Sequence, residues 1–99
     1  MRSYHYNMFN IGDIVKSKKG HDAKRYYIVI KNNIVEAGSS YVLLSDGCIK
    51  KLENLKKKNI KHLLLVESNN ELAEKISKKD ISNKEISDVI KTLIGGINV

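Results

Sequence analysis

The sequence predicts a mainly β fold with a C-terminal α region: a small five-stranded antiparallel β-barrel followed by two short helices. Two observations lead to this prediction. Between residues 11 and 66, short runs rich in β-branched and aromatic residues alternate with turn residues, and no helical pattern separates them. From residue 68 onward, the apolar residues change to the 3.6-residue spacing of a helix.

Five segments are expected to form the strands, and they are residues 11–16, 26–30, 41–45, 48–53 and 60–66. The second reads "YYIVI" and should be central, because it is β-branched and aromatic throughout. Turns are expected at Asn32–Asn33 and at Ala37–Ser40. Asp46-Gly47 predicts a hairpin into the fourth strand, since both residue types tolerate positive φ. Closing the five strands into a barrel would remove their exposed edges.

Two helices are expected after the strands. The first covers residues 69–78, and the second has Ser82 as its N-cap, with Glu85 completing a capping box. Gly95-Gly96 should end the second helix. Its apolar stripe is too short to be stable alone, so we expect it to pack within the chain. The stripe comprises Ile86, Val89, Ile90 and Leu93.

The 99 residues suit one domain, divided into a flexible tail at 1–8, the barrel at 9–67 and a two-helix appendage packed on the barrel at 68–99. One cysteine excludes an intramolecular disulfide. No apolar stretch approaches a membrane span, and no signal peptide is visible at the N-terminus. We therefore expect a cytoplasmic protein with no membrane contact.

The charge is distributed unevenly along the chain. Of a net charge of +7, residues 1–67 carry all the excess, with 13 Lys and Arg against 6 Asp and Glu, whereas residues 68–99 carry 5 of each. A merely solvated surface would also tolerate lysines, but such a one-sided distribution favours a face that binds a polyanion.

The basic residues lie in two groups, around the connection between the first two strands and around the "KKK" run. In a five-stranded barrel these connections can converge on one end, where phosphates would relieve the repulsion between them. Tyr26 or Tyr27 could add a stacked base, with a core role as the alternative. The candidate RNA-binding residues are Lys18, Lys19, His21, Lys24, Arg25, Lys50, Lys51, Lys56, Lys57, Lys58 and Lys61.

Signatures of catalysis are weak. His5, His21 and His62 share no metal-ligand spacing with Cys48. Gly12, Gly20 and Gly47 stand alone, so none of them belongs to a glycine-rich phosphate-binding loop. We expect no catalytic residue, no metal and no cofactor.

The stretch "GDIVKSKKGHDAKRYYIVI" resembles a KOW motif, the strand–loop–strand unit of several ribosomal proteins and transcription elongation factors. Residues 9–94 are similar to short bacterial KOW-domain RNA-binding proteins related to a ribosomal large-subunit protein of archaea and eukaryotes. The matching positions are Gly12, Val15, Ser17, Gly20, Asp22, Tyr41–Leu43, Asp46, Gly47, Lys51, Glu53, Lys56–Lys58 and Ile60–Leu63. Lys24 stands where the family has a loop glycine, and Leu55 where it has a proline.

The resemblance implies a Src-homology-3-like barrel that binds structured RNA, above all ribosomal RNA or a ribosomal particle, with a ribosomal protein as a further partner. The alternative is a protein-interaction module that uses a peptide groove or the apolar stripe of the second helix. The oligomeric state stays open.

Overall fold

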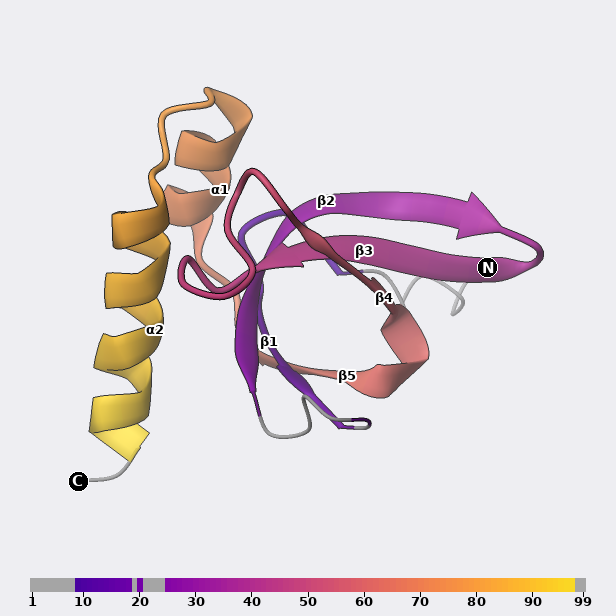
Figure 1. The fold of residues 1–99 in the computed structure, drawn as a ribbon, viewed down its shortest axis with the longest axis horizontal. Helices are drawn as coiled ribbons and strands as arrows, with labels where there is room; N and C mark the ends of the chain where they lie inside the picture. Colours follow the sequence, from indigo (N-terminus) through magenta and orange to yellow (C-terminus); the bar gives the residue numbers. More distant parts are fainter. Residues whose placement is uncertain (1–8, 19, 21–24, 98–99) are drawn as a thin grey trace.

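The computed structural model describes residues 9–18, 20 and 25–97 of the chain, and it contains a five-stranded antiparallel sheet followed by two helices (Figure 1). The predicted mainly β fold with C-terminal α structure is therefore confirmed. The predicted tail, residues 1–8, lies outside the described residues. The elements are β1 (Ile14–Ser17), β2 (Tyr26–Glu36), β3 (Ser39–Ser45), β4 (Lys56–Asn59), η2 (Ile60–His62, a 3-10 helix), β5 (Leu63–Glu67), α1 (Asn70–Ser77) and α2 (Asn83–Ile97).

The sheet has the strand order β4-β3-β2-β1-β5, so "YYIVI" does begin the central strand. The two outermost strands, β4 and β5, are consecutive in the chain and are joined only by the three residues of η2. So short a link keeps the two sheet edges close, and the sheet curls strongly between them (Figure 1). The backbone N–H of Lys18, just after β1, donates to the carbonyl of His62 in η2 at 2.8 Å, which ties this link to the end of β1.

Both faces of the central strands are buried, against different partners. Neighbouring residues of a strand point to opposite faces. Ile14 and Ile28 contribute to a core shared with the two helices, whereas Val15, Tyr27 and Val29 contribute to a second core made almost entirely from the curled sheet. This double burial explains why "YYIVI" is apolar without alternation. The helical residues of the first core are Leu72, Ile76, Ile86 and Ile90, with Val89 and Leu93 packed against it.

Two glycines allow the helices to approach the sheet closely. A Cβ on Gly12 would lie 2.7 Å from the backbone nitrogen of Ala73 in α1. A Cβ on Gly47 would lie 2.3 Å from the carbonyl oxygen of Asn83 in α2, and both glycines have positive φ. Only glycine combines this conformation with such contact distances.

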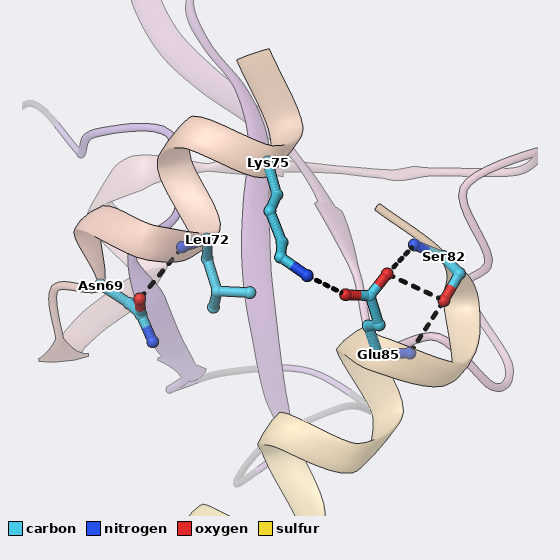
Figure 2. Close-up of polar contacts among 5 residues, drawn as sticks. All are labelled: Asn69, Leu72, Lys75, Ser82 and Glu85. Atoms are coloured by element: carbon cyan, nitrogen blue, oxygen red, sulfur yellow. Dashed lines mark hydrogen bonds and ion pairs between the residues drawn. The ribbon is translucent and has the colours of Figure 1, made fainter. Parts of the chain in front are cut away.

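The starts of both helices are capped by side chains, and the cap of the second helix was predicted (Figure 2). The amide of Leu72 donates to the Oδ1 of Asn69 at 3.0 Å. The amide of Glu85 donates to the Ser82 hydroxyl at 3.2 Å, and the Glu85 carboxylate accepts from the Ser82 amide at 3.1 Å, which is the reciprocal pattern of a capping box. No described helix is both long and apolar enough to cross a membrane.

The predicted fourth strand is wrong. Residues 48–53 do not pair with β3; they belong to a loop that the Asp46 carboxylate closes, because its Oδ1 accepts the amides of Cys48 at 2.9 Å and Lys50 at 2.8 Å. The loop is fastened to the first turn of α2, where Asn83 accepts from the amide of Leu52 at 2.8 Å. The fourth strand is instead β4, formed by the lysine run itself.

Several predicted boundaries were also wrong. β2 runs straight through the predicted turn at Asn32–Asn33, because register shifts in its pairing with β3 absorb the φ of 58° at Asn33. The reversal occurs at Ala37-Gly38 alone, where both φ angles are positive, as in a two-residue hairpin. Helix α2 continues past Gly95-Gly96 to Ile97.

Candidate functional site

Residues far apart in the sequence meet in one pocket of about 370 Å³, here called the basic pocket. Four of the described residues that line this pocket are basic, and no described lining residue is acidic. They come from three segments: the residue just before β2, the loop after β3, and β4. The described lining residues are Gly20, Arg25, Tyr27, Ile49, Lys50, Lys56 and Lys58.

Strand β4 places its lysines on alternate faces of the sheet. Lys58 pairs with Val42 and Lys56 pairs with Leu44, and both partners are buried in the sheet's own core. Paired residues of antiparallel strands share a face. Lys56 and Lys58 therefore extend from the edge of that core, with half-buried stems and with the charges at the pocket.

Lys57 points to the opposite face of the sheet and has its interaction partners there. Its ammonium group pairs with the carboxylate of Glu36 in β2 and lies 4.9 Å from the centre of the Tyr41 ring. The "KKK" run therefore contributes two cations to the pocket and one to the outer surface. This correction follows from the run being a strand rather than a loop.

A chain of hydrogen bonds holds the loop after β3, which carries Lys50, in place. The Ser45 hydroxyl donates to the carbonyl of Lys50 at 2.7 Å, and Asp46 fixes the amide of the same residue. At the far end of the loop, Asn83 donates to the carboxylate of Glu53 at 2.7 Å. This hydrogen bond lowers the pKa of Glu53, and the charge of Lys51 adds a smaller effect in the same direction.

The other predicted candidates divide into three groups. Lys18, Lys51 and Lys61 are exposed but do not line the pocket. Lys19, His21 and Lys24 lie outside the described residues. Tyr27 is 1% exposed and belongs to the core of the sheet, so it has the core role that the sequence left open as the alternative to base stacking.

Tyr26 remains available for contact with a ligand. It is half-buried, the ammonium group of Lys16 lies 5.7 Å from the centre of its ring, and it lines a second pocket between β2 and α2. This second pocket, here called the helix groove, has a volume of about 380 Å³.

Sequence reasoning missed Ile49, which is 62% exposed beside the basic pocket, because it was assigned to a strand. It also missed Lys91, whose charge is locally balanced by acidic residues of the same helix. No local signal marks either residue, since both reach their sites through tertiary packing.

Among the described residues, no group of three or more His, Cys, Asp or Glu side chains could hold a metal ion. No protein-family model matches the sequence, and no curated protein matches it either.

Proposed function

We propose that this chain is a non-catalytic, cytoplasmic RNA-binding protein whose curled sheet is a Src-homology-3-like barrel of the KOW type. The observation that carries the proposal is the basic pocket, where Arg25, Lys50, Lys56 and Lys58 arrive from three separate segments. The resemblance of "GDIVKSKKGHDAKRYYIVI" to a KOW motif points to ribosomal RNA or a ribosomal particle as the target.

The chemistry of the pocket suits phosphate groups. Four cations concentrate positive charge around one small volume, and a polyanion that binds there releases the counterions condensed on the nucleic acid. Three of the four are lysines, which act as point charges on flexible stems and contact backbone phosphates without demanding a fixed geometry. Phosphate contacts of this kind orient an RNA but do not read its sequence.

The test compares two double variants with the same change in charge. Lys56→Gln/Lys58→Gln removes two cations from the pocket, and Lys57→Gln/Lys61→Gln removes two from outside it. We expect the first to weaken RNA binding about tenfold or more and to reduce the slope of log affinity against log salt by about 0.7 for each lost phosphate contact. The second should have a much smaller effect.

Binding to ribosomal RNA can be measured by fluorescence anisotropy at several salt concentrations, with circular dichroism as the check on folding. Equal affinities for the two double variants would contradict the assignment of the pocket. Sedimentation of the tagged protein through sucrose gradients at two salt concentrations tests the target, and we expect migration with a ribosomal subunit at low salt only.

One observation favours the alternative of a protein-interaction module. The outer strand β5 pairs only with β1 among the described strands, and three consecutive apolar residues on it, Leu64, Leu65 and Val66, are 37–55% exposed. An exposed apolar edge can accept an extra strand from a partner. A partner retained after nuclease treatment and at high salt would support this alternative. The apolar stripe of α2 does not, because Ile86 and Ile90 are buried.

A further inference from the structure

The helix groove lies next to the basic pocket and differs from it in chemistry. Its apolar wall is formed by Tyr26 of β2 together with Ile90 and Ile94 of α2, and two cations, Arg25 and Lys91, also line it. Its volume of about 380 Å³ falls within the range of small-ligand sites. A nucleotide combines the same features, because its base is flat and weakly polar and its phosphate is anionic.

Arg25 lines both pockets. An RNA strand whose phosphates occupy the basic pocket can therefore continue past Arg25 and place its next base at the helix groove. This continuity favours a further part of the same RNA over a separate small molecule as the occupant of the helix groove.

We infer that the helix groove binds one unpaired nucleobase of the RNA and that Asp46 selects bases carrying an amino group. This inference rests on the proposed function. Asp46 lines the groove, and both of its loop hydrogen bonds, to the amides of Cys48 and Lys50, use Oδ1. The second oxygen, Oδ2, takes part in neither bond and can accept an N–H from a base.

Cytosine, adenine and guanine each present an amino group that can donate a hydrogen bond to a carboxylate. Uracil presents only an N3–H between two carbonyl oxygens, which repel the carboxylate. The groove should therefore discriminate against uracil, whereas the basic pocket should bind all sequences alike.

The first experiment measures the binding of oligo(A), oligo(C) and oligo(U) of about 12 nucleotides, a length that covers one small barrel. We expect oligo(C) and oligo(A) to bind at least about fivefold more tightly than oligo(U). The variant Asp46→Asn keeps an Oδ1 acceptor for the loop but replaces Oδ2 with an N–H donor, so the preference should vanish or reverse toward uracil.

The basic pocket supplies the matched control. Lys56→Gln/Lys58→Gln should weaken the binding of all three oligonucleotides by a similar factor. The ratios between their affinities should stay unchanged. If this variant lost the preference for oligo(A) and oligo(C) over oligo(U), the assignment of base selection to the helix groove would be contradicted.

The reactivity of the native cysteine tests the occupancy of the helix groove independently, without any variant. Cys48 is the single cysteine of the sequence, it is exposed, and it lines the helix groove with its Sγ 3.3 Å from the Ser87 hydroxyl. Saturating oligo(C) should slow alkylation of Cys48 by iodoacetamide severalfold, and oligo(U) at equal occupancy should protect it less. An unchanged alkylation rate under saturating oligo(C) would overturn the inference.

The outcomes separate the two proposals. If the protein binds none of the oligonucleotides and no ribosomal RNA, the proposed function fails and the inference fails with it. If all three bind equally, in a salt-dependent manner and without protection of Cys48, the inference alone fails and the RNA-binding function stands.

Discussion

Lys75 of α1 and Glu85 of α2 form an ion pair, with Nζ 2.5 Å from Oε2, and the other oxygen of the same carboxylate completes the capping box with Ser82 (Figure 2). One side chain therefore starts α2 and fastens it to α1. The hydrogen bond and charge of Lys75 lower the pKa of Glu85, and Glu85 in turn raises the pKa of Lys75.

The pH dependence of stability should reflect this pair. Because the pKa of Glu85 is lowered on folding, its contribution is present above the ordinary value of 4.5 and is lost as the pH falls through the folded pKa. Because the pKa of Lys75 is raised, its contribution is present below 10.5 and is lost as the pH rises through the folded pKa. Thermal melts of the wild type and Glu85→Gln should differ most between these limits. A difference that persists unchanged into strong acid would contradict the pairing.

Removal of the cap should destabilise α2. Ser82→Ala deletes the hydroxyl that accepts from the amide of Glu85, and we expect the free energy of unfolding to fall by about 1 kcal/mol. Ser82→Asp keeps an acceptor at the N-cap and should retain most of the stability. Urea denaturation followed by circular dichroism measures both, and equal stability of the alanine variant and the wild type would count against the cap.

Two glycines with similar backbone angles should respond very differently to alanine. Gly47 has φ +75° and Gly38 has φ +80°, but only at Gly47 would the new Cβ meet another backbone, that of Asn83 and Ser87. Gly38→Ala should cost about 1–2 kcal/mol, the strain of the left-handed conformation alone. Gly47→Ala should cost more than about 3 kcal/mol, because α2 must also move away. Similar denaturation midpoints would contradict the close approach.

Substitutions at the two adjacent tyrosines should affect different properties, the stability of the fold at Tyr27 and the binding of RNA at Tyr26. Tyr27→Ala empties the core of the sheet and should cost about 3–5 kcal/mol, enough to threaten the fold of so small a domain. Tyr26→Leu keeps an apolar side chain against the helices and should leave the melting temperature within a few degrees, while weakening oligo(C) binding. Calorimetry and anisotropy on the same samples test both halves. A stable Tyr27→Ala variant would show that the core assignment is wrong.

Local signals predicted the elements whose partners lie nearby in the chain. The Ser82–Glu85 capping box, the Ala37-Gly38 reversal and the central position of "YYIVI" all follow from short-range chemistry or from one run of residues. They are correct because their stabilising contacts are either inside the segment or required by its apolar character.

The wrong fourth strand arose because contacts with distant parts of the chain outweigh the local strand pattern. "CIKKLE" at 48–53 has a better strand pattern than "KKKN" at 56–59, yet the second forms β4 and the first forms a loop. The loop gains its own stability from the Asp46 carboxylate and from Asn83 of α2, 31 residues beyond Leu52. Lysines are tolerated in β4 because it is an edge strand, where charge also discourages aggregation.

The sequence by itself determined the class of fold, the excess of positive charge on the strand region and the start of α2, because these depend on composition and on neighbours within a few residues. Only the tertiary structure decided which cations share a pocket. The pairing of β4 with β3 sends Lys56 and Lys58 to one face and Lys57 to the other. Strand register has a period of two residues, so a shift by one would reverse this assignment, and contacts with distant β3 rather than the "KKK" run set the register.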